Sequence, residues 1–198
     1  MNKEDLSFDN FLLLGTEERE ELIKDYDALK IMIRKNLSER RYLHSISTAD
    51  TCRELARYHG VDEEKAYLCG LLHDCCKYDD KGNPKGMMES YLRRYDPVKL
   101  NGLYPAYHSW VAPYYLKEKL GFADEEVLNA IYNHTICTST DKLSLILFIA
   151  DKREPRRGIE DGILELAKQD LEKAYEVLNE NIKEYLESRN ERFVGKDL

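Results

Sequence analysis

The sequence contains no long hydrophobic run. No segment approaches the roughly 20 apolar residues that a membrane-spanning helix needs. The N-terminus, MNKEDLSFDN, is acidic and polar where a signal peptide would be basic and then apolar. Apolar residues make up 42% of the chain and charged residues 34%, a balance that also excludes a largely disordered protein. We therefore expect a globular cytoplasmic protein with no membrane partner.

An excess of positive charge is also lacking. The chain carries 30 lysines and arginines against 38 aspartates and glutamates, a formal net charge of −8. This balance argues against nonspecific binding to nucleic acid, which depends on cationic contacts with phosphates. It does not exclude a small anionic substrate, because a bound metal ion can reverse the field locally.

Paired cysteines are missing as well. The chain has five cysteines, an odd number, and no CxxC motif: Cys52, Cys69, Cys75, Cys76 and Cys137. Three of them fall within apolar helical patterns. Because free cysteine is often buried and disulfides are rare in reducing compartments, we expect buried free thiols.

Proline and glycine are scarce, with five and ten residues, and sustained alternation of apolar and polar residues is absent. Both observations favour helices joined by short loops over β-structure. The expected fold class is all-α, with a single domain carrying an N-terminal helical extension. We expect residues 1–35 to form a leader and a helix, and residues 36–198 to form the main domain.

Helical spacing and capping residues predict the individual elements. Residues 79–106 are rich in glycine and proline, so we expect mostly loop with a short helix over 88–94. A loop of this length is typical of a functional site. The other expected helices are 16–35, 38–60, 63–78, 107–120, 125–134 and 141–154, followed by one long helix from residue 159 to the end.

A histidine and an aspartate stand side by side in the apolar segment 63–78. Burying His73 and Asp74 together is costly unless they are paired or bind a metal. Taken alone, the dipeptide favours a structural reading, a hydrogen-bonded pair in the core.

Four further residues shift that balance. His44, His108, His134 and Asp151 lie on separate expected helices that can converge, and Asp151 ends an apolar run. Imidazole and carboxylate together suit iron, manganese or zinc. The sequence therefore predicts a metal site. The fifth histidine, His59, lies beside Gly60 at a helix end, where a capping or surface residue is ordinary.

The order H…HD…H…H…D on helices resembles the HD-domain superfamily of metal-dependent phosphohydrolases. The stretch RRYLHSISTADTCRELARYHGVDEEKAYLCGLLHDCCKY, followed by VLNAIYNHT and LSLILFIADKREPRR, is similar to the YqeK family. The resemblance covers residues 38–157. YqeK proteins are symmetrical diadenosine tetraphosphate hydrolases, so the resemblance implies cleavage of that dinucleotide into two molecules of ADP.

The resemblance also implies roles for matching residues. His44, His73, Asp74 and Asp151 would bind the metal, with iron expected first and manganese, magnesium or zinc as alternatives. The phosphates would be bound by Lys77, His108, His134, Thr135 and Arg157. Asp74 and Lys77 would be catalytic, and His108 with His134 would permit a second ion.

Basic residues near these positions extend the prediction. Lys77 lies three residues after Asp74, hence on the same face of the expected helix. Arg40 lies one helical turn before His44 and is a weaker candidate. We expect Arg153 and Arg156 to be solvated at a helix end.

Parts of the sequence depart from the family pattern. Cys137 stands where glycine is expected after the HT pair, the loop 79–106 is unusual, and the C-terminal tail lacks a proline-containing stretch. Because of these differences, the resemblance does not determine which residues contact the base and the ribose of the substrate.

Three alternative functions also stay open: another HD-type nucleotidase or phosphodiesterase, a nucleotide-sensing module, and a structural helical bundle. A homodimer is a further expectation.

Overall fold

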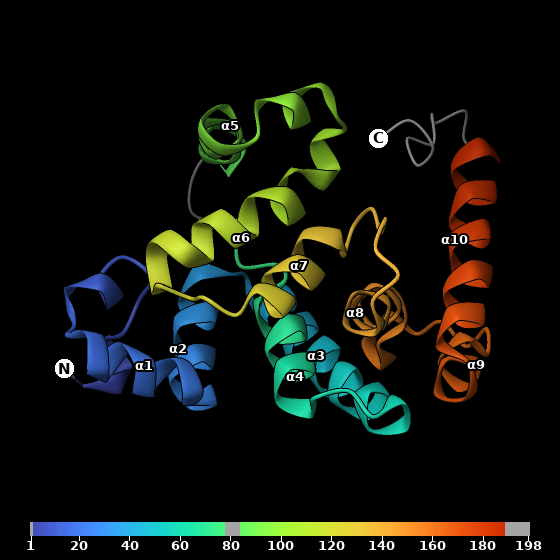
Figure 1. Cartoon of the computed structure of the whole chain (residues 1–198), viewed down its shortest axis with the longest axis horizontal. Coiled ribbons are helices and arrows are strands. Elements are labelled where there is room, and N and C mark those ends of the chain that lie inside the picture. Colours follow the sequence, from blue (N-terminus) through green and yellow to red (C-terminus); the bar gives the residue numbers. More distant parts are fainter. Residues whose placement is uncertain (1, 78–83, 189–198) are drawn as a thin grey trace.

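The computed structural model describes residues 2–77 and 84–188, and every regular element in these ranges is helical (Figure 1). The predicted all-α class is confirmed. None of the described helices has the length and apolar character needed to cross a membrane. The α-helices are α1 Thr16–Lys24, α2 Tyr26–Asn36, α3 Glu39–His59, α4 Glu63–Leu72, α5 Pro84–Tyr95, α6 Tyr107–Leu120, α7 Glu125–Asn133, α8 Lys142–Arg153, α9 Ile163–Gln169 and α10 Leu171–Ser188.

Five short 3-10 turns complete the described chain. They are η1 Lys3–Asp5, η2 Phe11–Leu13, η3 Pro97–Asn101, η4 Tyr104–Ala106 and η5 Pro155–Arg157. The helices α3, α6, α7 and α8 lie where the sequence predicts them. Helix α5 is longer than the expected 88–94, and η3 and η4 follow it within the expected loop.

Two long helices predicted from the sequence are each broken by an aspartate. The expected helix over 16–35 is divided at Asp25, whose carboxylate accepts hydrogen bonds from the backbone N–H groups of Asp27 and Ala28 and so caps α2. The expected helix from Ile159 onwards begins only at Ile163 and breaks again at Asp170. Its final predicted residues, 189–198, lie outside the described ranges.

The segment predicted as a helix over 63–78 ends early, at Leu72. In a continued helix, the Gly70 carbonyl would accept the backbone N–H of Asp74. Instead it accepts a hydrogen bond from Nδ1 of His73 at 2.7 Å. The prediction that His73 and Asp74 lie within a helix is therefore wrong. They occupy the turn that follows α4.

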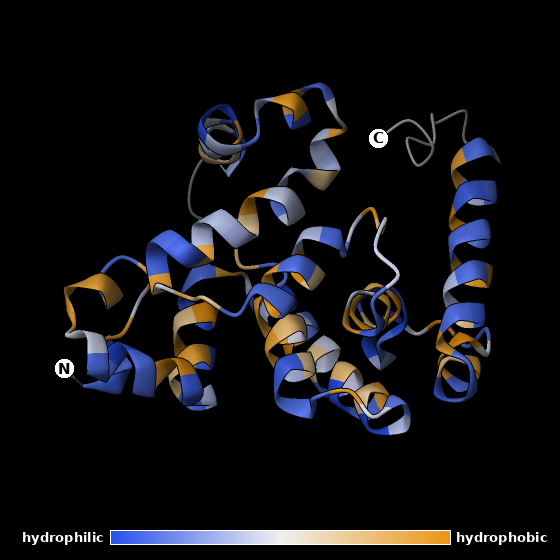
Figure 2. Ribbon diagram, in the orientation of Figure 1, coloured by the Kyte–Doolittle hydropathy of each residue, from blue (hydrophilic) through white to orange (hydrophobic). Residues whose placement is uncertain are grey.

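The buried apolar side chains form one continuous core. Helix α8 runs through it, with every residue from Leu143 to Ala150 buried, and Figure 2 shows this helix as mainly hydrophobic. The N-terminal leader contributes Leu6, Phe8 and Phe11 to the same core.

Helices α3 and α4 pack closely against each other at Gly70. A Cβ atom at this position would lie 2.5 Å from the backbone of Ala49 on α3. Glycine is therefore required for the close approach that brings His44 of α3 beside His73.

We predict that Gly70→Ala destabilises the protein by about 1–3 kcal/mol, because the methyl group forces two packed backbones apart. Urea unfolding followed by circular dichroism measures the change. Gly15→Ala is the matched control, since an added Cβ there meets no atom within 4 Å. Equal stability of the Gly70→Ala and Gly15→Ala proteins would contradict this description of the helix contact.

Candidate active site

Three helix ends converge on one cluster of side chains. His73 follows α4, His134 follows α7, and Asp151 lies in the last turn of α8, while His44 reaches the same place from within α3. The C-terminal end of a helix carries partial negative charge from its free carbonyl groups. This arrangement therefore favours a cation at the centre of the cluster.

Hydrogen bonds orient the histidine rings. Nδ1 of His73 donates to the Gly70 carbonyl at 2.7 Å, and Nδ1 of His134 donates to the Ile131 carbonyl at 2.6 Å. Because a carbonyl can only accept, each Nδ1 carries a proton, and each Nε2 has a free lone pair when the ring is neutral. Nδ1 of His44 is likewise bonded, at 3.0 Å, to the buried carboxylate of Glu154.

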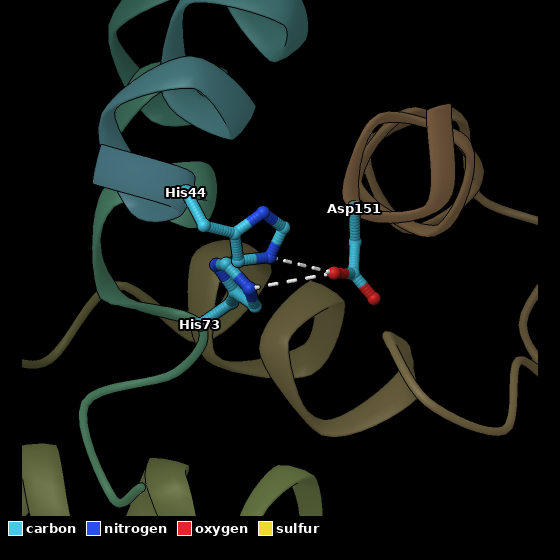
Figure 3. Close-up of side chains that lie close together, drawn as sticks. All are labelled: His44, His73 and Asp151. Atoms are coloured by element: carbon cyan, nitrogen blue, oxygen red, sulfur yellow. Dashed lines mark hydrogen bonds and ion pairs between the residues drawn. The ribbon is translucent and has the colours of Figure 1, made fainter. Parts of the chain in front are cut away.

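The Nε2 atoms of His44 and His73 both point at a carboxylate oxygen of Asp151 (Figure 3). Oδ1 of Asp151 lies 3.0 Å from Nε2 of His44 and 3.6 Å from Nε2 of His73. Nε2 of His73 lies 3.4 Å from Oδ1 of Asp74. Ligands about 2.1 Å from a common metal ion are about 3.0–3.5 Å apart in tetrahedral or octahedral geometry. The spacing of these donor atoms matches that of a metal site.

Asp74 is the most enclosed carboxylate of the cluster, with 1% of its surface exposed. Its Oδ1 lies 3.0 Å from Nζ of Lys77, 3.5 Å from Nε2 of His108 and 3.7 Å from Nε2 of His134. Burial alone would raise the pKa of this carboxyl group, but electrostatic interactions with His73 and with the ammonium group of Lys77 hold the pKa well below its ordinary value of 3.8. Asp74 is therefore ionised at neutral pH.

Nε2 of His73 and Oδ1 of Asp74 are buried and make no hydrogen bond among the described residues, although Oδ1 of Asp74 forms an ion pair with Lys77 at 3.0 Å. Buried polar atoms without hydrogen bonds are rare, and a bound ion explains them. Within residues 2–77 and 84–188, two triads that share His73 can hold an ion, namely His44–His73–Asp151 and His73–Asp74–His134. Their imidazole and carboxylate donors fit a divalent transition metal.

His108 and Thr135 complete the cluster on its other side. Nε2 of His108 lies 2.9 Å from Nε2 of His134 and 3.1 Å from Oγ1 of Thr135. Burial lowers the pKa of both histidines, and the charge of Lys77 lowers that of His108 further, well below 6.5. Nε2 of His108, Nε2 of His134 and Oδ1 of Asp74 lie within 3.7 Å of one another, so His108 and His134 stay the predicted ligands of a second ion.

A cavity of about 390 Å³ opens beside the metal ligands. Four arginines and one lysine face it, together with His44, Asp74 and Glu154; the cations are Arg40, Arg41, Lys77, Arg156 and Arg157. Nη2 of Arg157 lies 3.0 Å from Oδ1 of Asp151. A pocket rich in guanidinium groups next to a metal site is suited to phosphate.

The structure places the basic residues singled out in the sequence as follows. Lys77, expected on the same helix face as Asp74, pairs with Asp74 across the turn that follows α4. Arg156 is exposed and also faces the cavity, while Arg153 pairs with Asp161. His59 lies away from the cluster and hydrogen-bonds the Ala167 carbonyl. All five cysteines are free and buried, as expected.

Three residues of the site are missing from the prediction. Arg41 lies 3.4 Å from Oδ2 of Asp74; its position three residues before His44 was the available signal. Glu154, three residues after Asp151, orients His44.

The third residue, Lys152, links the two triads. Its Nζ donates to the His134 carbonyl at 2.7 Å and lies 3.4 Å from Oδ2 of Asp151. No sequence pattern marks that link between the two triads.

The helical fold and the histidine–aspartate cluster define an HD-domain protein. Residues 41–156 match the HD domain family, and the chain belongs to it. A crystal structure from Clostridium acetobutylicum, described as a predicted HD superfamily hydrolase involved in NAD metabolism, is similar over 88% of this chain and 90% of its own, with a TM-score of 0.70 and 29% identity.

The family can be stated more narrowly. A symmetrical bis(5'-nucleosyl)-tetraphosphatase from Halalkalibacterium halodurans is 34% identical over 146 residues, covering 71% of this chain and 75% of the relative. A protein of the same name from Staphylococcus aureus is 36% identical over 137 residues, covering 67% and 68%. Within the HD-domain proteins, this chain belongs to the YqeK family of symmetrical bis(5'-nucleosyl)-tetraphosphatases.

We predict that Glu154→Ala weakens metal binding by about 10- to 100-fold, because His44 loses the carboxylate that holds its ring and its protonated Nδ1 in place. Competition with a chromogenic chelator measures the affinity. Glu160→Ala, at an exposed position, is the control. Unchanged affinity in Glu154→Ala protein with native circular dichroism would show that His44 is not a ligand oriented by Glu154.

We also predict that the metal-free protein loses stability as the pH falls below about 6.5. His108 and His134 have lowered pKa values in the folded state, so the unfolded chain binds more protons below 6.5 and acid favours unfolding. The hydrogen bonds of His44 to Asp151 and Glu154 outweigh its burial and raise its pKa, so this group acts in the opposite sense.

Urea unfolding in EDTA at pH 7, 6 and 5 tests this prediction through variants. His134→Gln should lose less stability between pH 7 and pH 5 than the unsubstituted protein, by up to about 1.4 kcal/mol per pH unit. His59→Gln, outside the cluster, should follow the unsubstituted protein. Parallel pH profiles for all three proteins would contradict the assigned neutral state of His134.

Proposed function

We propose that this chain is a metal-dependent hydrolase that cuts diadenosine tetraphosphate symmetrically into two molecules of ADP. The observation that carries the proposal is the placement of the metal-ligand cluster directly beside the arginine- and lysine-lined cavity. The relatives named as symmetrical tetraphosphatases, at 34% and 36% identity, support this substrate over other nucleotides.

In this proposal His44, His73, Asp74 and Asp151 hold the tightly bound ion, and the triad containing His134 offers a weaker second position. Iron is the proposed metal, because the imidazole and carboxylate ligands suit it and the resemblance to the family implies it. Manganese, magnesium and zinc are the alternatives to test. The bound ion supplies Lewis-acid chemistry, polarising a phosphoryl oxygen and lowering the pKa of water.

The chain's own cations bind the substrate. Lys77 and Arg157 lie on the cavity wall next to Asp74 and Asp151, where they can contact oxygens of the reacting phosphoryl group. Because negative charge is distributed over those oxygens in the transition state, fixed cations stabilise it. Arg41 extends the same basic wall towards the next phosphate.

Proton transfer has two acceptors within the cluster. Oδ1 of Asp74 and Nε2 of His108 lie 3.5 Å apart. Either atom can take the proton of the attacking water. Thr135 and His134 both contact Nε2 of His108, at 3.1 and 2.9 Å, and so fix the position of that ring.

Chromatographic product analysis tests this proposal. We expect metal-loaded protein to release only ADP from diadenosine tetraphosphate. Asp74→Ala should lose metal binding and turnover together, and Lys77→Ala should lower kcat by about 100-fold while metal binding is retained. Lys142→Ala, on an exposed lysine outside the cavity, is the control.

Two results would overturn the proposal. Release of AMP and ATP would keep the metal site but reject the symmetrical cut. Absence of turnover in protein with bound metal would direct attention to other substrates, and a panel of mononucleotides, cyclic dinucleotides and dinucleoside polyphosphates then separates another HD-type hydrolase from a nucleotide-sensing module.

A further inference from the structure

A second cavity, of about 340 Å³, adjoins the basic cavity. The two share a wall formed by Arg41 and Lys77, and His108 lines the second cavity at 3.5 Å from Asp74. A molecule that fills both cavities must therefore cross these two cations beside the proposed reaction centre. The second cavity has the size of a small-molecule site.

The walls of the second cavity differ in chemistry from those of the first. Away from the shared cations, it is lined by Pro84 and Met88 of α5 and by Tyr104 and Pro105 of η4. Among the described residues, no carboxylate lines the second cavity, whereas the basic cavity includes Asp74 and Glu154. The second cavity thus offers apolar and aromatic surface where the first offers charge.

Tyr104 supplies the aromatic face, and its ring is held by its neighbours. The side chain of Tyr104 is 44% exposed. Its ring packs edge-on against Tyr107, with 5.6 Å between centroids and 77° between planes. The hydroxyl of Tyr107 donates to the Leu100 carbonyl at 2.7 Å, and Gly102 packs directly against the buried Trp110 ring. These contacts anchor both sides of the short turn that carries Tyr104.

We propose that this second cavity is a nucleoside subsite, in which one adenine of the substrate stacks on Tyr104 while its phosphates cross Arg41 and Lys77 into the basic cavity. The inference rests on the proposed function, which supplies a ligand with an aromatic base at the end of a phosphate chain. Any nucleobase has a π-face that stacks on an aromatic side chain. Phosphate alone would gain nothing from Tyr104, Pro105 and Met88.

The position of the subsite accounts for an unusual part of the sequence. The aromatic segment LYPAYHSWV, residues 103–111, begins within the unusual loop 79–106, and Tyr104, Pro105 and His108 within it all line the second cavity. This segment therefore joins the metal cluster, through His108, to the proposed base-stacking residue.

Binding of two probes to metal-loaded protein tests the subsite. ADP carries the base and pyrophosphate does not, so titration calorimetry with both separates base contacts from phosphate contacts. We expect Tyr104→Ala to weaken ADP binding by about 5- to 100-fold and to change pyrophosphate binding less than twofold. Tyr104→Phe should retain ADP binding. Tyr58→Ala, at a tyrosine 58% exposed on α3, is the control and should bind both probes normally.

Equal loss of both probes in Tyr104→Ala, or no loss of either, would overturn the subsite. So would unmodified protein that binds ADP no more tightly than pyrophosphate. Failure of the proposed function gives a different result: the unmodified protein would not cleave diadenosine tetraphosphate, yet ADP binding would still depend on Tyr104. Cleavage with an unchanged KM in Tyr104→Ala protein would keep the function and reject the subsite.

Discussion

The burial of two carboxylates, Asp74 and Asp151, is the constraint on which the rest of the site depends. An ionised carboxylate inside a helical core is strongly unfavourable unless opposite charge or a metal ion lies beside it. Here the compensation comes from the ammonium groups of Lys77 and Lys152 and from the guanidinium groups of Arg41 and Arg157. Arg41 lies on α3 and Arg157 in η5, so these segments must pack closely against the turn after α4 and against α8 for the carboxylates to be buried at all.

The same hydrogen bonds shape the backbone and prepare the ligands. The ring of His73 bonds to Gly70, and that of His134 bonds to Ile131, so each occupies a carbonyl at the end of its own helix. The bond that terminates the helix also fixes the proton on Nδ1 and frees Nε2. Helix C-termini, which favour cations, therefore lie where the metal-binding nitrogens point. The hydrogen bond from Nδ1 to the carbonyl thus both ends the helix and prepares Nε2 to bind a metal.

Much of this arrangement is predictable from the sequence, because helical spacing and capping residues are local signals. The bounds of α3, α6, α7 and α8 follow from them, and the rarity of buried histidine and aspartate marks the cluster. The breaks at Asp25 and Asp170 were missed because an aspartate that caps a new helix resembles a polar residue on the exposed face of a continuous one. The early end of α4 depends on the orientation of the His73 ring, which spacing does not determine.

The contacts of Arg41, Lys152 and Glu154 were missed for another reason, because they join segments far apart in the chain. Glu154 meets His44 across 110 positions of sequence. Lys77 lies beside Asp74 as the sequence spacing indicates, but across a turn, because the expected helix does not continue that far. The second cavity was equally hidden, since α5, η4 and α6 approach the site only in the folded molecule.

The position of the bound ion is the measurement that tests the central claim most directly. Anomalous diffraction at the absorption edge of the metal, from crystals of metal-loaded protein, locates it. We expect an ion about 2.0–2.2 Å from Nε2 of His44 and His73 and from carboxylate oxygens of Asp74 and Asp151. An ion bound elsewhere, with these four side chains paired only to one another, would contradict the metal site and the chemistry proposed for it.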